Sequence, residues 1–423
     1  MVPQLVLSDK NGNIYVHPTL KMLGSDGRNF CLPQNNETIP LPKDSSFFYM
    51  PGHAACGWDE KGRAFVVVKE FQGKEVYPVS AFMVPGFVRL YLPAARKLRK
   101  QITLPLWPYT AVGWLKGRFY VCAVKIDYAR KHRPLDSAQE SLMKRNIDRT
   151  LKKFPKSRLF KHLSRCAVVY NCPNARNLFL KRWEAPVPIS PVCNSRCLGC
   201  LSFQESDCAV ASHERIRFVP TPDEVVEVAL THLKVAREAI VSFGQGCEGE
   251  PLLQFPVLKK SIALLRRHVA TGTIHLNTNG SHPSYLKELA LNGLDSVRIS
   301  LNSLNEKRYN AYYRPQGYSF GDVLTSIREA KENGLFVSLN LLMFPGFSDC
   351  EEEIASLAKF LKKGYVDLVQ LRNLSIDPEF FITRMPFPKS RPRGIVSLIA
   401  LLKKFSPKVR LGYFNLPKER FKL

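Results

Sequence analysis

The alternation of predicted strands and helices after residue 186 is the feature that most limits how this chain can fold. Apolar runs such as 239–243 have the length of buried strands, and amphipathic helices separate them. One helix is predicted to begin after Thr221, because Pro222 suits the first helical position and Glu224 can close a capping box. Strands that alternate with helices form parallel sheets. The sequence therefore predicts an α/β fold, a partial (β/α)6 barrel of the TIM type with its site at the carboxyl ends of the strands.

The regions around this barrel differ from it in composition. Residues 1–133 contain short β-rich runs separated by turns rich in glycine, proline and aspartate, which predicts a β-rich N-terminal domain of unknown role. Residues 134–185 are helical in pattern and strongly basic, so we expect a basic helical connector. The barrel is then predicted over residues 186–385, and residues 386–423 form a basic C-terminal segment.

Length and composition exclude several classes of protein. The chain has 423 residues, enough for two or three domains with their own cores. No run of about 18 uninterrupted apolar residues occurs, so neither a transmembrane helix nor a membrane partner is predicted. No signal peptide is evident, and eleven cysteines without a regular framework do not indicate a disulfide-bonded secreted protein. We therefore expect a cytoplasmic location.

Three cysteines near the start of the predicted barrel carry the strongest chemical signal. Cys193, Cys197 and Cys200 have the spacing C-x3-C-x2-C. Three thiolates on one short loop can hold three irons of a [4Fe–4S] cluster and leave the fourth iron open to a small molecule, whereas a cluster with four protein ligands mainly passes electrons. The alternative is a structural zinc loop, but zinc usually takes its fourth ligand from a second C-x2-C or H-x3-H pair, and the sequence contains none.

The cysteine run resembles the cluster-binding loop of the radical S-adenosylmethionine (SAM) superfamily, and further landmarks of that family follow in order. Residues 244–251, with the sequence G-Q-G-C-E-G-E-P, resemble the family's Gly-Gly-Glu-Pro loop. Residues 274–280 resemble its third strand with a T-N-G end, residues 296–303 its fourth strand, and residues 337–349 its fifth strand and the following loop. The resemblance covers about residues 186–385.

Two positions depart from the family pattern. Gly199 stands where the residue before the third cysteine is usually aromatic, which leaves open how the adenine face of SAM is covered. Glu248 stands in place of the first glycine of the Gly-Gly-Glu-Pro loop, while Gly249, Glu250 and Pro251 remain.

The resemblance implies an enzyme. A [4Fe–4S] cluster on the three cysteines would bind SAM and cleave it reductively to a 5′-deoxyadenosyl radical, which would modify an unidentified substrate in an oxidoreductase or transferase reaction. The resemblance also implies an electron donor such as flavodoxin or ferredoxin. By position, the resemblance assigns SAM binding to six residues: Gly249, Glu250, Asn279, Arg298, Ser300 and Asn302. The alternative for each is a structural role, as the cap of a turn or as a hydrogen-bond partner of a neighbouring residue.

The side of the site that meets the substrate is less clearly marked. Arg372, Asn373 and Asp377 follow the predicted sixth strand, where the substrate often lies in this superfamily. An aromatic cluster around Tyr312 and Tyr313 follows the fourth strand, and packing is its simpler explanation. No catalytic residue is predicted.

The charge of the chain bears on its partner. Lys and Arg number 62 against 36 acids, a net charge of +26, and such a surface attracts polyanions, RNA first among them. Two aromatic residues, Phe154 and Phe160, lie among the basic side chains of residues 144–165. Their rings could stack on bases. The alternative is a helix whose basic face is exposed to solvent and whose two rings pack in the core. The charge favours RNA as the substrate, ahead of a polypeptide or a small metabolite. A nucleic-acid-binding iron–sulfur redox sensor without catalysis is the alternative.

Two further cysteines lie just before the barrel. Cys166 and Cys172 have the spacing C-x5-C, which is not a standard zinc pair, and buried free thiols are their ordinary explanation. The other hypothesis is a second metal centre that they form with Cys208 or Cys247.

Overall fold

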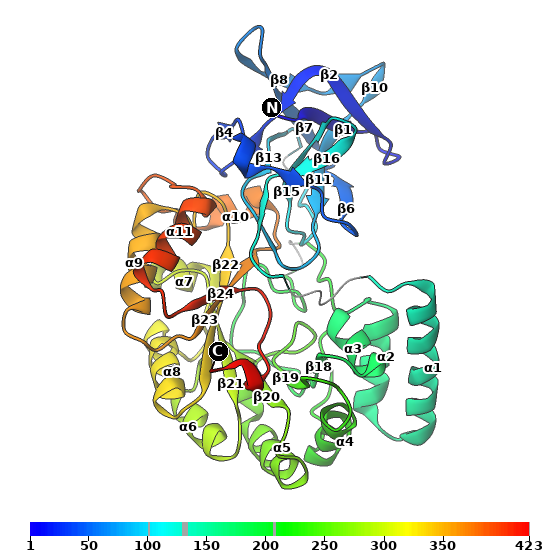
Figure 1. Ribbon diagram of the computed structural model, residues 1–423, viewed down its shortest axis with the longest axis vertical. Helices are drawn as coiled ribbons and strands as arrows, with labels where there is room; N and C mark the ends of the chain where they lie inside the picture. The colour runs from blue at the N-terminus through cyan, green and yellow to red at the C-terminus, as the bar shows by residue number, and fades with distance from the viewer. Residues whose placement is uncertain (100–101, 129–133, 206–208, 423) are drawn as a thin grey trace.

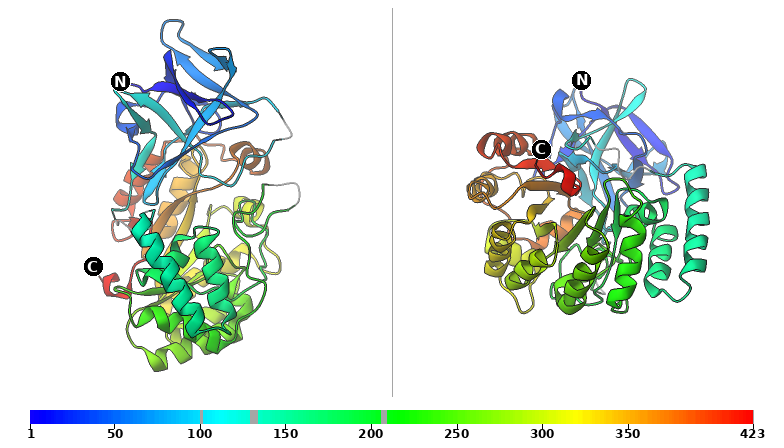
Figure 2. Two further views of the ribbon diagram at one scale, coloured as in Figure 1. Left: turned by 90° about the vertical axis from the view of Figure 1, so that its right-hand side faces the viewer. Right: turned by 60° about the horizontal axis from the view of Figure 1, so that its bottom comes forward.

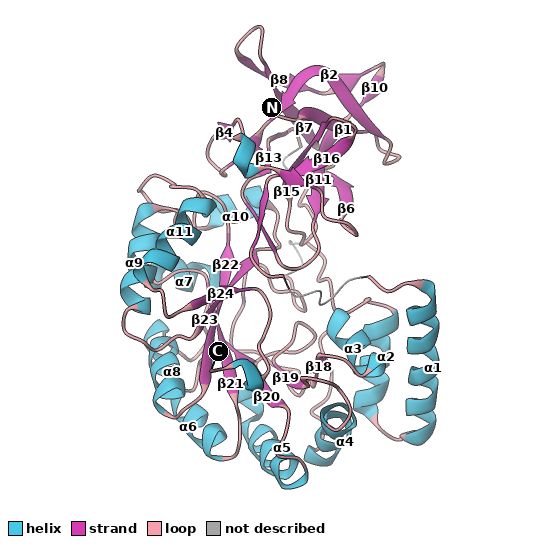
Figure 3. Ribbon diagram, in the orientation of Figure 1, coloured by secondary structure: helices cyan, strands magenta, loops and turns pink. Residues whose placement is uncertain are grey.

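The computed structural model describes residues 1–99, 102–128, 134–205 and 209–422. An antiparallel β region from the N-terminus stands over one end of a curved parallel sheet, and three helices, α1 to α3, flank that sheet (Figure 1). Figure 3 shows the separation clearly, with mostly strands and one short 3-10 helix, Asn35–Glu37, in the upper part and helices around the lower part. No helix in the described ranges combines the length and the apolar character needed to cross a bilayer.

A parallel sheet with its strands in chain order forms the barrel part. Every neighbouring pair in it is parallel. Its seven strands are β18 (Glu184–Pro186), β19 (Ile240–Phe243), β20 (Thr273–Thr278), β21 (Ser296–Leu301), β22 (Phe336–Met343), β23 (Leu368–Asn373) and β24 (Arg410–Gly412).

Helices cover the outer, convex face of this sheet (Figure 2). Their order repeats the strand–helix alternation along the chain. They are α4 (Pro222–Leu233), α5 (Phe255–His268), α6 (Pro283–Leu291), α8 (Phe320–Glu332), α9 (Glu351–Leu361) and α11 (Ile395–Phe405). Two further helices, α7 (Glu306–Tyr313) and α10 (Pro378–Arg384), lie at the carboxyl end of the sheet, where the rings of Tyr312 and Phe381 are neighbours.

The predicted α/β fold, with six strand–helix units, is confirmed. The N-terminal cap of α4 is the expected capping box: Thr221 Oγ1 accepts from the Glu224 N–H at 3.2 Å, and the Glu224 carboxylate accepts from the Thr221 N–H at 2.9 Å. The sheet also has a seventh strand that was not predicted. β24 is only three residues long, which is too short to show a strand period in the sequence.

The N-terminal region is β-rich, as predicted, and its strands are antiparallel. The largest sheet has the order β14-β7-β2-β1-β11-β15-β16-β5, with β6 beside β11 and β8 beside β7. The members of this sheet are β1 (Gln4–Ser8), β2 (Ile14–Met22), β5 (Ile39–Pro40), β6 (Ser46–Tyr49), β7 (His53–Asp59), β8 (Ala64–Val68), β11 (Tyr77–Phe82), β14 (Ala95–Lys97), β15 (Thr110–Leu115) and β16 (Arg118–Val121). The smaller sheets contain β3 (Gly24–Ser25), β4 (Phe30–Cys31) and β13 (Leu92–Pro93), β9 (Glu70–Phe71) with β10 (Lys74–Glu75), and β12 (Phe87–Arg89) with β17 (Ala123–Lys125).

Three helices connect the two parts. They are α1 (Ser137–Lys153), α2 (Arg158–Val168) and α3 (Pro173–Leu180). Asp136 caps α1 and Ser157 caps α2. Phe160 is fully buried and its ring stacks on Phe154 with 5.0 Å between centroids, so Phe160 belongs to the core and is not free to stack on a base.

One buried arginine fastens the N-terminal region to the carboxyl ends of β22 and β23. The guanidinium of Arg89, on β12, donates to the Leu374 carbonyl at 2.9 Å and to the Tyr109 carbonyl at 3.2 Å. The Arg89 N–H donates to Asn373 Oδ1 at 3.0 Å, and Asn373 Nδ2 donates to the Phe87 carbonyl at 2.9 Å. The N-terminal region therefore lies at the end of the barrel where the site is expected.

Candidate functional site

The carboxyl ends of the parallel strands surround a cavity of about 390 Å³. Cys193 and Cys197 line it, while Cys200 and Asn302 are not among its lining residues. Five of the six predicted SAM-binding residues line the same cavity, although they come from three different strand ends: Gly249, Glu250, Asn279, Arg298 and Ser300.

Backbone hydrogen bonds hold the cysteine loop against the end of α7. The N–H groups of Arg196 and Leu198 donate to the carbonyls of Tyr313 and Tyr312, each at 3.0 Å. Further along, the Gln316 N–H donates to the carbonyl of Asn194 at 2.8 Å, also from the chain after α7. The conformation of the loop is thus set by main-chain contacts that do not involve the cysteine side chains.

The three cysteines of this loop are free thiols, each partly exposed. Within the described part of the chain, their sulfur atoms are not close enough together to share one metal ion. Thiols that stand further apart suit a larger centre such as an iron–sulfur cluster. Burial raises the pKa of Cys193 to about 11, so this thiol keeps its proton until a metal replaces it.

Arg215 is a cation beside the third cysteine that no sequence motif marks. Its guanidinium lies 3.7 Å from Cys200 Sγ, and its Nε donates to Ser202 Oγ at 3.1 Å. The guanidinium therefore lies within hydrogen-bond distance of the sulfur of the third cysteine. Arg215 reaches this position because the chain after Cys200 folds back onto the cysteine loop.

Tyr312 explains why glycine occupies position 199. A Cβ on Gly199 would lie 2.9 Å from the Tyr312 hydroxyl and 3.3 Å from the Ser375 carbonyl, and both contacts would be too tight. Tyr312 is buried and lines the cavity. The tyrosine occupies the space beside the loop into which a larger residue at position 199 would extend.

Glu248 ties the end of β18 to the end of β19. Its carboxylate accepts from the N–H groups of Ile189 at 2.8 Å and Ser190 at 3.2 Å, and from two N–H groups of its own loop, Gly244 and Gln245. Burial raises the pKa of Glu248 to about 8, while these hydrogen bonds act in the opposite direction. The residue that departs from the family pattern therefore has a definite role in holding the loop.

Gly249 allows this loop to touch the cysteine loop. A Cβ on Gly249 would lie 1.9 Å from the carbonyl oxygen of Val192, so no larger residue fits. The Gly249 N–H donates to the Ser190 carbonyl at 2.7 Å, and the Glu250 N–H donates to the Val192 carbonyl at 2.9 Å. These bonds join the loop of Gly249 and Glu250 to the residues just before Cys193.

The carboxyl group of Glu250 is buried and hydrogen-bonded. It accepts from Thr278 Oγ1 at 2.5 Å, from the Asn279 N–H at 2.7 Å and from the Leu252 N–H at 3.0 Å. Burial raises the pKa of Glu250 to about 7. Its protonation therefore changes close to neutral pH.

The two asparagines predicted to bind SAM donate their side-chain hydrogen bonds to neighbouring segments of the protein. Asn279 lines the cavity, but its Nδ2 donates to Asn194 Oδ1 at 2.7 Å and to Ser195 Oγ at 2.9 Å, so its amide supports the cysteine loop. Asn302 lies just beyond the end of β21 and donates to the Arg308 carbonyl at 3.3 Å.

Two arginines make part of the cavity wall positive. Arg298 donates from Nη1 to Gln370 Oε1 at 2.8 Å, while its buried Nε has no partner among the described residues. Arg372 donates to the Tyr413 carbonyl at 2.9 Å and stacks over that tyrosine ring. Burial, with the charge of Arg372 second, lowers the pKa of Arg298 to about 10. Paired guanidinium groups in one cavity favour an anionic group on the ligand.

Known proteins match the part of the chain that carries this cavity. The family model for the radical SAM superfamily matches residues 187–361. The GTP 3′,8-cyclase of Peptoclostridium acidaminophilum is 34% identical over 173 residues, 40% of this chain and 48% of that protein. The GTP 3′,8-cyclase of Aquifex aeolicus is 30% identical over 183 residues, 43% of this chain and 53% of that protein.

The match to these relatives is partial. The chain spans about half the length of the curated relatives it matches. Among solved structures, the FeFe-hydrogenase maturase HydG from Carboxydothermus hydrogenoformans aligns over 66% of this chain and 71% of that chain, with 15% identity and a TM-score of 0.39.

Proposed function

Since this chain belongs, over residues 187–361, to the radical SAM superfamily, we propose that it binds a [4Fe–4S] cluster and SAM at the cavity and modifies a substrate by radical chemistry. The observation that supports this proposal best is that five of the six predicted SAM-binding residues line one cavity with Cys193 and Cys197. When bound, the cluster and SAM would supply a hydrogen-abstracting radical by reductive cleavage of SAM.

The residues of the chain would divide this work. Cys193, Cys197 and Cys200 would hold the cluster, and Arg215 would donate a hydrogen bond to the sulfur of Cys200. Four further residues line the cavity and would contact SAM, whereas we propose that Asn279 and Asn302 act by supporting neighbouring segments. The four are Gly249 and Glu250 at the amino group, Arg298 at the carboxylate and Ser300 at the ribose or carboxylate.

Anaerobic reconstitution tests this function. The full chain is incubated with iron and sulfide, reduced with dithionite in the presence of SAM, and assayed for iron and 5′-deoxyadenosine. We expect about four irons per chain and formation of 5′-deoxyadenosine. A cluster without 5′-deoxyadenosine would indicate the redox sensor instead, and zinc without iron would indicate a structural metal loop.

The proposal includes an external reductant. Enzymes of this superfamily generally need one, and flavodoxin or ferredoxin is the class of donor that we propose. We propose a cytoplasmic location, because a reducing compartment keeps the thiols of the cysteine loop free to bind a cluster.

The carboxyl of Glu250 should make SAM binding depend on pH. Only the ionised carboxylate attracts the SAM ammonium group, so protons and SAM compete for Glu250, whose pKa is about 7. SAM affinity should therefore fall as the pH drops from 8 to 6, approaching about a tenfold loss per pH unit below that pKa. Isothermal titration of the reconstituted protein measures it. Glu250→Gln should bind more weakly and lose this dependence, and an unchanged pH profile would remove Glu250 from the contact.

We propose RNA as the substrate, ahead of a polypeptide or a small metabolite, because of the basic surface. All nine basic side chains of residues 144–165 are exposed, along α1, α2 and the turn between them. The cavity arginines, Arg298 and Arg372, suit an anionic small molecule equally well. The matching relatives are named for a nucleotide, GTP, which is compatible with RNA and with a small anionic molecule.

Salt dependence distinguishes the RNA proposal. If α1 and α2 contact a phosphate backbone, log affinity for single-stranded RNA should fall by about 0.7 per neutralised phosphate for each tenfold rise in salt. Replacing Lys152, Lys153 and Lys156 by Gln should weaken binding and flatten this slope in fluorescence anisotropy. The matched control replaces three exposed lysines of α9 and its C-terminal end, on the opposite side of the molecule (Figure 1): Lys359, Lys362 and Lys363. Equal effects of both triple variants would contradict a specific RNA surface.

We also propose a second metal centre, and the structure describes three of the four cysteines that the sequence offered as its ligands. Cys166 is buried, and its carbonyl accepts from the Cys172 N–H at 3.0 Å. The sulfur of Cys172 does not belong to a close set of ligand atoms among the described residues. Cys208 lies outside the described residues. Among the described cysteines of this hypothesis, Cys166 and Cys247 belong to one close set of ligand atoms.

A further inference from the structure

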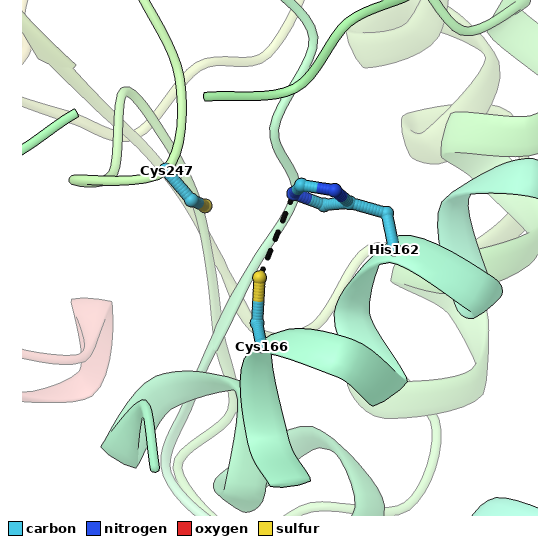
Figure 4. Close-up of side chains that lie close together, drawn as sticks. All are labelled: His162, Cys166 and Cys247. Carbon is cyan, nitrogen blue, oxygen red and sulfur yellow. Dashed lines mark hydrogen bonds between the residues drawn. The ribbon is translucent and has the colours of Figure 1, made fainter. Parts of the chain in front are cut away.

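Two cysteines and a histidine from distant parts of the chain meet between α2 and the loop after β19. His162 Nε2 lies 3.6 Å from Cys166 Sγ, and these two atoms and Cys247 Sγ all lie within 4.8 Å of one another (Figure 4). His162 and Cys166 share one face of α2 because they are four residues apart. Cys247 approaches from the opposite side, on the loop that carries Glu248 and Gly249.

These separations match those of ligands that share one metal ion. Zinc binds cysteine sulfur at about 2.3 Å and histidine nitrogen at about 2.0–2.1 Å, so at a tetrahedral angle the two atoms stand about 3.5–3.6 Å apart. The Cys166–His162 distance of 3.6 Å already has this value. Two sulfurs on one zinc stand about 3.8 Å apart, and Cys247 Sγ lies within 4.8 Å of both other atoms, so it would need to move by up to about 1.3 Å.

The surroundings favour a metal that prefers sulfur and nitrogen. Cys166 and Cys247 are buried, with exposed fractions of 1% and 3%, while His162 is partly exposed. The set contains no carboxylate, which makes calcium or magnesium poor candidates.

We propose that His162, Cys166 and Cys247 bind one zinc ion, with the fourth position open to water or a further ligand. The ion would join α2 to the loop after β19. Cys247 also accepts, through its carbonyl, from the Ile216 N–H at 2.8 Å, so a third segment is held at the same point. The site shares no ligand with the cysteine loop at Cys193, and it does not depend on the proposed SAM chemistry.

Metal content of the full chain tests the proposal. Protein purified anaerobically is analysed for zinc and iron before and after iron–sulfur reconstitution. We expect about one zinc per chain at both stages. His162→Ala and Cys166→Ser should each lose the zinc and keep the iron, whereas Cys56→Ala, which removes a buried thiol of the N-terminal region, should keep both. Because zinc and iron are counted separately, failure of this proposal is distinct from failure of the cluster proposal.

A spectroscopic measurement covers the case of a variant that does not fold. Zinc-edge X-ray absorption of the wild-type protein should show two sulfur ligands and one histidine nitrogen near the expected distances. The proposal is overturned by a zinc shell made of oxygen alone, by zinc that survives in both variants, by protein free of zinc, or by a Cys166–Cys247 disulfide found by non-reducing peptide mapping.

Discussion

Replacing any one of Cys193, Cys197 and Cys200 by alanine is expected to remove the iron–sulfur absorbance of the reconstituted protein and to reduce SAM cleavage to background. Each cysteine would supply one of three thiolates, and a cluster with an open fourth iron has no ligand to spare. None of the remaining described cysteines stands on the same loop. Iron content, visible absorbance and 5′-deoxyadenosine formation measure the effect.

The control for these variants is Cys31→Ala. Cys31 is a partly exposed thiol on β4, in the N-terminal region, and its removal should leave the absorbance and SAM cleavage unchanged. Full SAM cleavage by one of the three loop variants would remove that cysteine from the proposed ligand set.

Arg89→Ala is expected to destabilise the protein by about 3–5 kcal/mol. The side chain is fully buried, and its loss would leave the carbonyls of Leu374 and Tyr109 without this donor and open a cavity beside Phe344. Chemical denaturation followed by fluorescence measures the change in the free energy of unfolding.

An exposed arginine of the same region provides the comparison for Arg89. Arg96, on β14, is exposed, so Arg96→Ala should change the free energy of unfolding by no more than about 0.5 kcal/mol. A similarly small effect of Arg89→Ala would mean that the contact between the N-terminal region and the barrel does not depend on this side chain.

Local patterns account for the parts of the fold that were predicted. The capping box at Thr221 and the apolar run of β19 each involve neighbouring residues, so the sequence shows them directly. β24 escaped prediction because a three-residue strand gains its identity from pairing with β23 and not from its own pattern.

In the candidate site too, features that depend on neighbouring residues could be predicted, and features that depend on the folded chain could not. Gly249 and Glu250 belong to one short motif, and both line the cavity as expected. Asn302 was expected to contact SAM because the resemblance places it at the end of the fourth strand, but β21 ends at Leu301, and Asn302 is not among the residues that line the cavity. Arg215 could not be predicted, because it reaches the site only through the path of the folded chain.

The contact that Arg89 makes also sets an order of events during synthesis of the chain. Its partners Asn373 and Leu374 lie 284 and 285 residues further along the sequence. At about 5–20 residues per second, the ribosome needs roughly 15–60 s to make that stretch. During this interval the N-terminal strands have no barrel to pack against. The nascent N-terminal region is therefore expected to be the part of the molecule that most needs protection from aggregation while the chain is being made.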